Sequence, residues 1–453
     1  MAINFSSPNK SGPNYPGRFS DRRSWSVVCY FLVLSICILF LHSCAVTRDV
    51  LAILPPPGQD PDSIPKNYFL VDEKVDVIGR PAVIRLEKGE TLPDIARHFS
   101  LGINTLAAAN PAVDVWVPGA GDRIVLPLSF ILPEADREGI VINLAAMRLF
   151  SFRKKGNLQA VATYPVGVGT AERPTPKGLM SITRKKFQPT WYVPASIAAD
   201  HREKGDPLPA MVPPGPLNPL GEHALYLSES GYLIHGTNKP ASIGLRASNG
   251  CIRLYPEDIK QLFDTTPVKT PVRIMNQPYL IGRRNGMIYL EAHTPFEESS
   301  TAELKKVYAK LKKIEKNTGL TLDWDKVEKV LAETRGIPVV ISASGAGGET
   351  AVAETIKLRH PLALYGQPQV PEFRIDAWYV LAATMRDTVE ACRLAAILNH
   401  QGPQIPARVL SKSGRHRVLA GPFHNEGEAK NASKRLRIDL EIDGILVAPV
   451  QHE

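Results

Sequence analysis

Cysteine is scarce in this chain of 453 residues, which contains five. Cys29, Cys37 and Cys44 lie near the N-terminus, so the rest of the chain has only Cys251 and Cys392. Two cysteines are too few for a disulfide scaffold. No Cys/His cluster has the spacing of metal ligands, and no glycine-rich loop has a nucleotide-binding pattern. The sequence therefore predicts no metal and no cofactor.

Acidic residues are outnumbered, because 54 lysines and arginines face 45 aspartates and glutamates, for a net charge of +9. Such a charge suits an anionic partner: nucleic acid, a membrane surface or a carboxylate-rich cell-wall polymer. With 44% hydrophobic and 22% charged residues the chain is globular. Its length allows roughly two to four domains. Its 39 prolines favour a modular, loop-rich protein over a helical bundle.

Charge is absent from the apolar run Trp25–Leu41, which follows three arginines between positions 18 and 23. A positive segment before an apolar one is typical of an export signal. The run ends in Leu-His-Ser-Cys, which resembles a bacterial lipobox and would make Cys44 a lipidation site. His42 is unusual in such a box, so an uncleaved signal anchor and a buried core helix stay open as alternatives. Residues 1–44 are thus predicted to export or anchor the protein.

A small α+β unit is predicted at residues 80–128, after a Pro- and Asp-rich linker at 45–79. Its expected elements are a strand at 82–86, helices at 92–99 and 103–109, and a strand at 123–127. With its KGETL, AAANP and DRIVLP segments this unit resembles a LysM carbohydrate-binding module. The resemblance implies binding of glycans that contain N-acetylglucosamine. Another small α+β domain is the alternative.

Short β-type runs separated by Gly/Pro turns occupy residues 138–276 and predict a mainly-β sandwich or barrel. These runs are GIVINL, MRLFSF, AVATYPVGVG, GLMSITR, ALYLS, GYLIHG, CIRLY and PVRIMN. One helix is expected at 256–264, where proline comes first and apolar residues have helical spacing. The Pro-rich stretch 189–220 is expected to be a long loop. Two charged amphipathic helices in residues 277–342 would form a helical C-terminal subdomain.

The last unit, residues 376–451, follows a flexible linker predicted at 343–372. It contains two successive strand–helix–strand segments, the second with RVLAGPF. This α+β repeat resembles a SPOR domain, which implies binding of peptidoglycan glycan strands stripped of stem peptides. RNA-binding modules share the topology, but the central strands lack stacking aromatics. Together with export, this argues against nucleic acid as a partner. Cys392 is interpreted as a packing residue of its first helix.

The residues suited to catalysis are His235, at the end of one expected strand, and Cys251, at the start of the next. If the two strands are neighbours, both side chains lie at the same edge, within hydrogen-bond reach. The imidazole can then take the thiol proton and give a thiolate nucleophile. Backbone N–H groups around Gly250 and Cys251 could hold a tetrahedral oxyanion. Alone, either residue would more often be structural.

Together, IHGTN and LRASNGCIRL closely resemble the catalytic signature of the L,D-transpeptidase (YkuD) family, and the likeness extends over roughly residues 138–340. The resemblance implies that Cys251 is the nucleophile, that His235 is the general base, and that the carbonyl of Gly236 orients the imidazole. It also implies a substrate-binding site that contains Arg253, a candidate for a substrate carboxylate, and the further residues Thr237, Asn238, Ser248 and Asn249.

One position departs from the family pattern: Asn249 stands where many members have a second histidine. Other branches have small polar residues there, so activity is retained in the hypothesis with His235 as the only base. The departure also keeps open a protein that binds septal peptidoglycan without catalysis.

The resemblance implies an acyl-enzyme formed from a tetrapeptide stem with loss of D-alanine. An amine would resolve it, either another stem, giving a 3-3 crosslink, or a lysine of an outer-membrane lipoprotein. Resolution by water, as in an amidase, is the alternative. The expected location is the periplasm of a Gram-negative bacterium, with membrane anchoring and a role at the division site. The LysM- and SPOR-like modules would anchor the enzyme on glycan strands.

Overall fold

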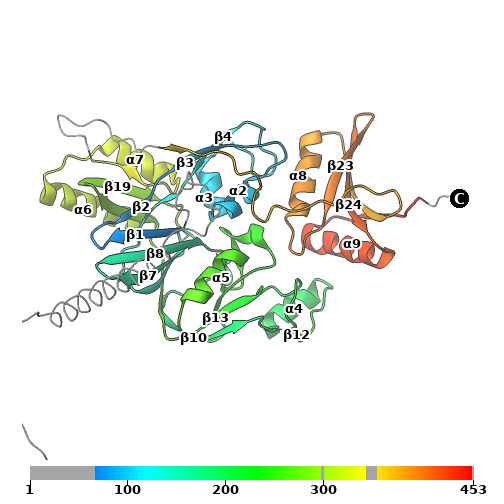
Figure 1. Cartoon of the computed structure of the whole chain (residues 1–453), viewed down its shortest axis with the longest axis horizontal. Helices are drawn as coiled ribbons and strands as arrows, with labels where there is room; N and C mark the ends of the chain where they lie inside the picture. The colour runs from blue at the N-terminus through cyan, green and yellow to red at the C-terminus, as the bar shows by residue number, and fades with distance from the viewer. Residues whose placement is uncertain (1–66, 297–299, 343–354, 451–453) are drawn as a thin grey trace, which may run out of the picture. The chain divides into compact units, whose positions relative to one another are not determined.

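The computed structural model describes residues 67–296, 300–342 and 355–450 (Figure 1). All of these residues belong to one compact unit of the chain. The apolar run 25–41 and the expected lipidation site Cys44 lie outside the described residues. Within the described ranges, no helix is both long enough and apolar enough to cross a membrane.

A nine-stranded sheet occupies the region predicted to be mainly β. Its strand order is β1-β8-β7-β6-β17-β10-β13-β14-β16. Neighbours are antiparallel except for the parallel pairs β6–β17 and β14–β16. In the part of the chain that the structure describes, β1 and β16 are the outer strands, so the sheet is open rather than a closed barrel. The strands are β1 (Tyr68–Asp72), β6 (Gly139–Asn143), β7 (Arg148–Lys155), β8 (Leu158–Pro165), β10 (Gly178–Phe187), β13 (His223–Leu227), β14 (Leu233–His235), β16 (Ile252–Arg253) and β17 (Pro271–Met275).

Both faces of this sheet are buried where β6, β7 and β8 pair. Because side chains alternate along a strand, neighbouring residues enter different cores. Ile140 and Leu149 pack in a core with α5 (Pro256–Thr265). Val141 and Phe150 pack on the other side, in the core of the small unit that precedes the sheet. The small unit is therefore fixed to the nine-stranded sheet through a shared core.

The small unit has the elements predicted for residues 80–128. They are β3 (Ala82–Arg85), α2 (Leu92–His98), α3 (Ile103–Ala109) and β4 (Arg123–Leu126), with the additional pair β2 (Val77–Gly79) and β5 (Ser129–Ile131). Helix α2 begins at a capping box: the Thr91 side chain accepts from the Asp94 backbone, and the Asp94 side chain accepts from the Thr91 backbone. Leu92 and Ile95 of this helix are fully buried.

Two predicted linkers contain strands. Strand β1 and strand β2 lie within 45–79, and β1 pairs antiparallel with the outer side of β8. Strand β21 (Ile356–Lys357) lies within 343–372 and pairs parallel with β3. Both segments hydrogen-bond to strand edges formed by distant parts of the chain. The linker-like composition of the two segments could not reveal those edges.

The stretch 189–220, predicted to be a loop, contains helix α4 (Ala195–Glu203) and the paired strands β11 (Trp191–Tyr192) and β12 (Met211–Val212). All nine residues of α4 are described, and none is buried. An exposed helix needs no apolar stripe, so the sequence has no periodic signal for it.

Residues 277–342 form a sheet with two helices over it. Strands β18 (Tyr279–Arg284), β19 (Met287–Ala292) and β20 (Val339–Val340) pair in that order. Helices α6 (Ser300–Thr318) and α7 (Trp324–Glu333), which were predicted, share one core with them. The three strands were not predicted.

The C-terminal domain is a four-stranded sheet with order β23-β24-β22-β25, and its two helices share one core on the sheet (Figure 1). Its elements are β22 (Trp378–Met385), α8 (Thr388–Asn399), β23 (Ala407–Lys412), β24 (Arg415–Phe423), α9 (Glu426–Leu440) and β25 (Ile445–Val447). The predicted order of strands and helices is confirmed.

Candidate active site

Two neighbouring parallel strands bring His235 and Cys251 to the same face of the sheet. Ile234 pairs with Ile252, and His235 pairs with Arg253. Ile234 and Ile252 are fully buried in the core. Because side chains alternate, His235, Arg253 and Cys251, which directly precedes β16, all project from the opposite face. The catalytic hypothesis required that these two strands be neighbours, and the backbone meets that condition.

His235 is a neutral base in this environment. Its Nδ1 lies 2.6 Å from the carbonyl oxygen of Gly236. A carbonyl only accepts, so Nδ1 has the proton and Nε2 has the free lone pair. The side chain is buried, and burial together with the nearby Arg253 charge lowers its pKa to about 3. Hydrogen bonds to the carbonyls of Gly236 and Leu220 oppose this shift only in part.

The Cys251 thiol is half-buried, and burial raises its pKa above the ordinary value. The backbone of Leu233 and the charge of Arg253 act in the opposite direction. Among the residues that the structure describes, Sγ has hydrogen bonds with the carbonyl oxygen of Gly231, at 3.6 Å, and with the backbone of Leu233, and none with the imidazole. The free protein thus has a neutral thiol beside a neutral imidazole, which differs from the expected thiolate–imidazolium pair. Desolvation of both groups is the reason.

The turn before Cys251 is held by its own polar groups. Ser248 Oγ donates to the carbonyl of Cys251 at 2.5 Å and accepts from the Gly250 N–H at 3.2 Å. Gly250 has φ +98°, and a Cβ there would lie 2.7 Å from Cε1 of Tyr232. Ser248 is buried and has both hydrogen bonds within the turn. Ser248 thus shapes the turn, and its assignment to the substrate-binding site stays a prediction.

The loop 170–177 supports this turn from outside, and sequence reasoning assigned it no role. Thr175 Oγ1 donates to the carbonyl of Gly250 at 2.9 Å and accepts from the Gly169 N–H at 3.0 Å. Arg173 donates from NH1 to Oδ1 of Asn249 at 2.7 Å. These partners lie about 75 positions apart in the chain, so sequence spacing gave no signal for them.

Arg253 is a mostly buried cation beside the thiol and the imidazole. Its NH1 lies 3.5 Å from Ser242 Oγ, and its Nε is buried without a hydrogen-bond partner among the described residues. In the same described set, no ion pair joins it to an acidic side chain. A buried guanidinium without a carboxylate is suited to bind an anion.

Thr237 and Asn238, expected beside the base, hold loops together. Thr237 Oγ1 accepts from the Lys239 N–H at 2.9 Å. Asn238 Nδ2 donates to the carbonyls of Pro216 and Leu217 at 3.4 and 3.3 Å. Asn238 thus connects the loop after the base to the end of the segment 189–220.

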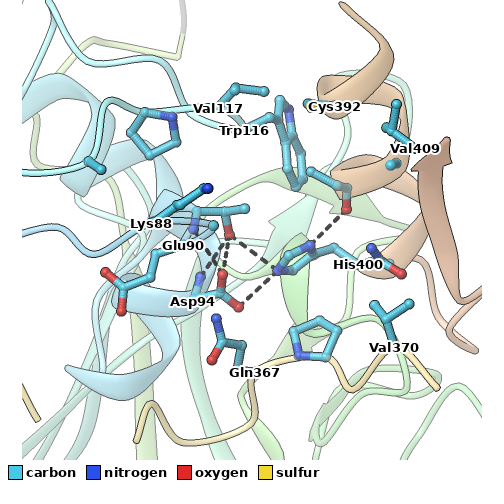
Figure 2. A pocket seen from close by; sticks show the side chains of 18 residues that line it. Lys88, Glu90, Asp94, Trp116, Val117, Gln367, Val370, Cys392, His400 and Val409 are labelled. Atoms are coloured by element: carbon cyan, nitrogen blue, oxygen red, sulfur yellow. Dashed lines mark hydrogen bonds and ion pairs between the residues drawn. The ribbon is translucent and has the colours of Figure 1, made fainter. Parts of the chain in front are cut away.

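A cavity of about 460 Å³ lies apart from Cys251 and His235, between side chains of the small unit and of α8 and β23 (Figure 2). His400 Nε2 lies 3.1 Å from Asp94 Oδ1 and 3.3 Å from Thr91 Oγ1, while its Nδ1 lies 2.8 Å from the carbonyl of Ala396. Cys392 lines this cavity. The interpretation of Cys392 as a packing residue stays a prediction.

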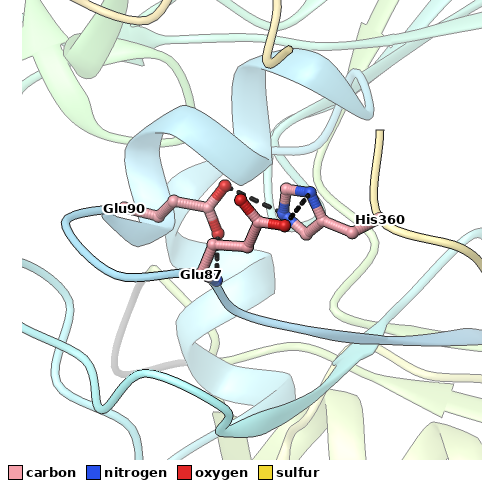
Figure 3. Close-up of side chains that lie close together, drawn as sticks. All are labelled: Glu87, Glu90 and His360. Atoms are coloured by element: carbon pink, nitrogen blue, oxygen red, sulfur yellow. Dashed lines mark hydrogen bonds and ion pairs between the residues drawn. The ribbon is translucent and has the colours of Figure 1, made fainter. Parts of the chain in front are cut away.

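A second polar cluster joins Glu87, Glu90 and His360 (Figure 3). Their potential ligand atoms lie within 4.8 Å of one another. His360 Nε2 is 2.8 Å from Glu90 Oε1, and its Nδ1 is 3.5 Å from Glu87 Oε1 and 2.8 Å from the carbonyl of Pro361. These contacts fasten the segment around β21 to the small unit. Because His360 lies far along the chain from the two glutamates, a search for metal-ligand spacing could not find the group.

Comparison with known proteins identifies two regions. Residues 137–274 match the model of the L,D-transpeptidase catalytic domain (YkuD), and residues 376–448 match the SPOR domain. The chain is 38% identical over 294 residues to a probable L,D-transpeptidase ErfK/SrfK of Salmonella typhimurium, covering 63% of this chain and 94% of that protein. It is 41% identical over 232 residues to a probable L,D-transpeptidase YbiS of Escherichia coli K12, covering 50% and 75%.

A third relative is a probable L,D-transpeptidase YcfS of Escherichia coli K12, 42% identical over 215 residues, or 46% of this chain and 67% of that protein. The molecule thus combines an L,D-transpeptidase catalytic domain with a SPOR domain. The chain belongs to the L,D-transpeptidase family that includes ErfK/SrfK, YbiS and YcfS.

Proposed function

We propose that this protein remodels peptidoglycan as an L,D-transpeptidase that forms an acyl-enzyme on Cys251. The observation that most strongly supports the proposal is the common face of Cys251 and His235, with Nδ1 of the neutral imidazole on the Gly236 carbonyl, so that Nε2 is the nitrogen whose lone pair would accept a proton. The stem peptide ends in carboxylates, and the unpaired Arg253 guanidinium beside the thiol suits such a group.

Binding of the substrate would activate the base. The positive charge of Arg253 is one of the causes that lower the pKa of His235. A carboxylate paired with Arg253 offsets that charge, so the pKa of His235 rises when the substrate is bound. The imidazole becomes a stronger base at the moment when the thiol must be deprotonated.

Acylation then follows in two proton transfers. The thiol turns from the Gly231 carbonyl toward Nε2 of His235 and gives up its proton, while Sγ attacks the carbonyl carbon of the third residue of a tetrapeptide stem. The Gly250 N–H already donates to Ser248 Oγ, so the Cys251 N–H is the proposed donor to the oxyanion. The C–N bond breaks, and the imidazolium returns its proton to the amine of departing D-alanine.

The thioester is resolved by an amine. His235 takes a proton from the attacking amine, the new amide forms, and Cys251 leaves as thiolate and recovers the proton. A stem side chain as acceptor gives a 3-3 crosslink, and a lysine of an outer-membrane lipoprotein gives attachment of that protein. We propose the periplasm as the location, with the N-terminal segment as anchor.

The flanking units would hold the enzyme on its substrate. We propose that the small unit binds glycan strands in the manner of a LysM module and that the SPOR domain binds strands without stem peptides. Two weak sites on one polymer raise the local concentration of stems near Cys251.

The test is incubation of the full chain with a disaccharide-tetrapeptide, followed by mass spectrometry. The expected products are peptide-linked dimers and free D-alanine, and a carbapenem is expected to add its mass to the protein. Cys251→Ala and His235→Ala should each abolish both results while sacculus binding persists. Tripeptide without dimers would indicate hydrolysis, and a wild-type protein without products or adduct would contradict the proposal.

A further inference from the structure

The loop 170–177 contacts both the turn that presents Cys251 and the segment 189–220. We infer that Arg173 is a positioning residue that holds these two parts in register, a role that rests on the proposed function of Cys251. One terminal nitrogen of its guanidinium, Nη1, donates to Oδ1 of Asn249 at 2.7 Å. The other terminal nitrogen, Nη2, lies 2.7 Å from Oδ2 of Asp200 on α4.

The shape of the guanidinium makes both contacts possible at once. Its nitrogens form a rigid planar fork, so the two bonds fix the direction as well as the distance between Asn249 and Asp200. A lysine ammonium is a single point on a flexible stem and would bond to one partner at the expense of the other. The side chain of Arg173 is about one-third exposed, at 34%, so its effect on global stability is small.

The backbone of the same loop is already anchored to the turn. The Arg173 N–H donates to Thr170 Oγ1 at 3.2 Å, and Thr175 Oγ1 donates to the carbonyl of Gly250 at 2.9 Å. Arg173 and Thr175 therefore hold Asn249 and Gly250, the two residues directly before Cys251. Asn249 occupies the position at which the sequence departs from its family, and here its side chain serves as an acceptor for arginine.

Helix α4 depends on polar contacts because none of its residues, all described, is buried. Apolar packing therefore fixes its position only weakly, and the ion pair of Asp200 with Arg173 is a polar contact that ties it to the turn before Cys251. At its far end, the same segment is tied to the loop after His235 by Asn238, which donates to Pro216 and Leu217. Arg173 thus provides one attachment of the segment 189–220, in addition to those through Asn238, through the ion pair of Asp206 with Lys434 of α9 and through the Leu220 carbonyl.

The two arms of Arg173 predict different kinetic effects. The hydrogen bond with Asn249 acts on the nucleophile turn, the residues 248–250 directly before Cys251. Its loss therefore slows acylation by every acyl donor, large or small. The ion pair with Asp200 acts on α4. Its loss therefore raises KM for a stem peptide and leaves acylation by a small carbapenem unchanged. A merely structural role would not divide the effects in this way.

The experiment uses the full chain and compares acylation by imipenem with turnover of a disaccharide-tetrapeptide. Arg173→Ala and Asn249→Ala should each slow imipenem acylation about tenfold, because small misplacements of reacting groups cost rate steeply. The double variant should be acylated no more slowly than Arg173→Ala, because both substitutions remove the same contact between Arg173 and Asn249. Asp200→Asn should raise KM for the peptide about fivefold with imipenem acylation unaltered. Arg173→Lys should not restore the wild-type rate.

Arg273→Ala is the matched control. Arg273 pairs with Asp136 in the same domain, has a similar side-chain exposure of 37%, and does not contact the nucleophile turn. Its removal should change neither rate. Additive losses in the double variant, or wild-type acylation by Arg173→Ala, would overturn the inference.

A second measurement separates this inference from the proposed function. If wild-type protein forms no adduct with imipenem, the proposed function fails, but hydrogen exchange still tests the contact. Arg173→Ala should speed amide exchange at least about fivefold in α4 and in residues 246–250 relative to Arg273→Ala. Unchanged exchange in both segments would contradict the positioning role.

Discussion

Burial determines the protonation of the two side chains that we propose to react, at the scale of single residues. It lowers the pKa of the His235 imidazole to about 3 and raises the pKa of the Cys251 thiol. A neutral pair is protected from oxidants and metals, which prefer a thiolate. As a consequence, His235 is a weak base in the free protein. The charge of Arg253 contributes to that weakness, and substrate binding would offset it.

The low pKa of His235 and the raised pKa of Cys251 predict how the rate of acylation varies with pH. Because the pKa of His235 lies well below 6.5, the imidazole is deprotonated throughout the range from pH 5 to pH 7. The second-order rate constant for imipenem acylation should therefore vary by less than about twofold over that range. It should rise only at alkaline pH, where the thiol ionises. Stopped-flow measurement across pH 5 to 10 tests this, and a clear inflection near pH 6.5 would contradict it.

The nucleophile turn shows how elements, rather than single residues, build the site. Gly250 at φ +98° is needed because any side chain would strain the backbone and collide with the Tyr232 ring. Thr175 from the loop after β9 (Val168–Gly169) then holds the Gly250 carbonyl. Strand β9 itself pairs with β15 (Arg246–Ser248), so the loop and the turn start from one short ladder.

Gly250→Ala tests the turn. We expect a loss of about 2 kcal/mol in the free energy of unfolding, from backbone strain plus the contact with Tyr232, and a loss of imipenem acylation of at least about tenfold. Thermal unfolding and intact-mass spectrometry provide the measurements. Gly156→Ala is the matched control, because Gly156 also has positive φ, at +61°, with open space where a Cβ would lie.

The control should lose only about 1 kcal/mol from backbone strain and keep full acylation. If both variants lost the same stability and both remained reactive, the turn at Gly250 would have no special part in presenting the thiol.

Local signals predicted most of the elements, and contacts between distant segments account for what was missed. Helix α2 was predictable because Leu92 and Ile95 repeat at helical spacing. The parallel pairing of β14 with β16 could only be assumed, yet the His235 and Cys251 motif pointed to it. Helix α4 escaped prediction because an exposed helix has no apolar stripe. The roles of Arg173 and Thr175 were not predicted, because their hydrogen-bond partners lie about 75 positions away in the chain.

For the whole molecule, the small unit and the catalytic sheet form one body instead of two modules on a linker. They share an apolar core, and a buried polar network crosses between them. Ser100 Oγ of the small unit donates to Asp258 Oδ2 of α5 at 2.9 Å, and Arg148 NH2 donates to the Ser100 carbonyl at 3.0 Å. Burial, with the charge of Glu257, raises the pKa of Asp258 to about 8.

This shift predicts how stability varies with pH. A carboxyl whose pKa is higher in the folded protein stabilises the fold fully below its unfolded pKa of 3.8, and that contribution is lost as pH rises toward about 8. Asp258→Asn keeps an acceptor for Ser100 and cannot ionise. We expect the variant to gain about 4 kcal/mol relative to wild type between pH 5 and pH 8, from about 1.4 kcal/mol for each pH unit.

Chemical denaturation of both proteins at each pH tests this prediction. A difference between wild type and variant that stays constant with pH would show that Asp258 does not titrate in this range.

Removal of residues 376–453 tests the division of labour across the molecule. The C-terminal domain contacts the small unit through His400 with Asp94 and through Arg393 with Asp114, but it has a core of its own. We expect truncation to weaken sacculus binding several-fold in a pull-down assay and to leave the rate of imipenem acylation within about twofold. Loss of acylation would mean that the domain supports the catalytic centre directly.

The parallel register of β14 and β16 has a consequence for how such enzymes can vary. The separation of thiol and imidazole is set mainly by two adjacent strands and less by the fifteen residues of chain, 236–250, that connect them. Away from Gly236 and from the turn 248–250, that connection can therefore lengthen, shorten or acquire new side chains for a different acceptor while the reacting atoms stay where they are. The residues around the entrance to this site can therefore be exchanged, in evolution or by engineering, while the two strands that hold the reacting groups stay the same.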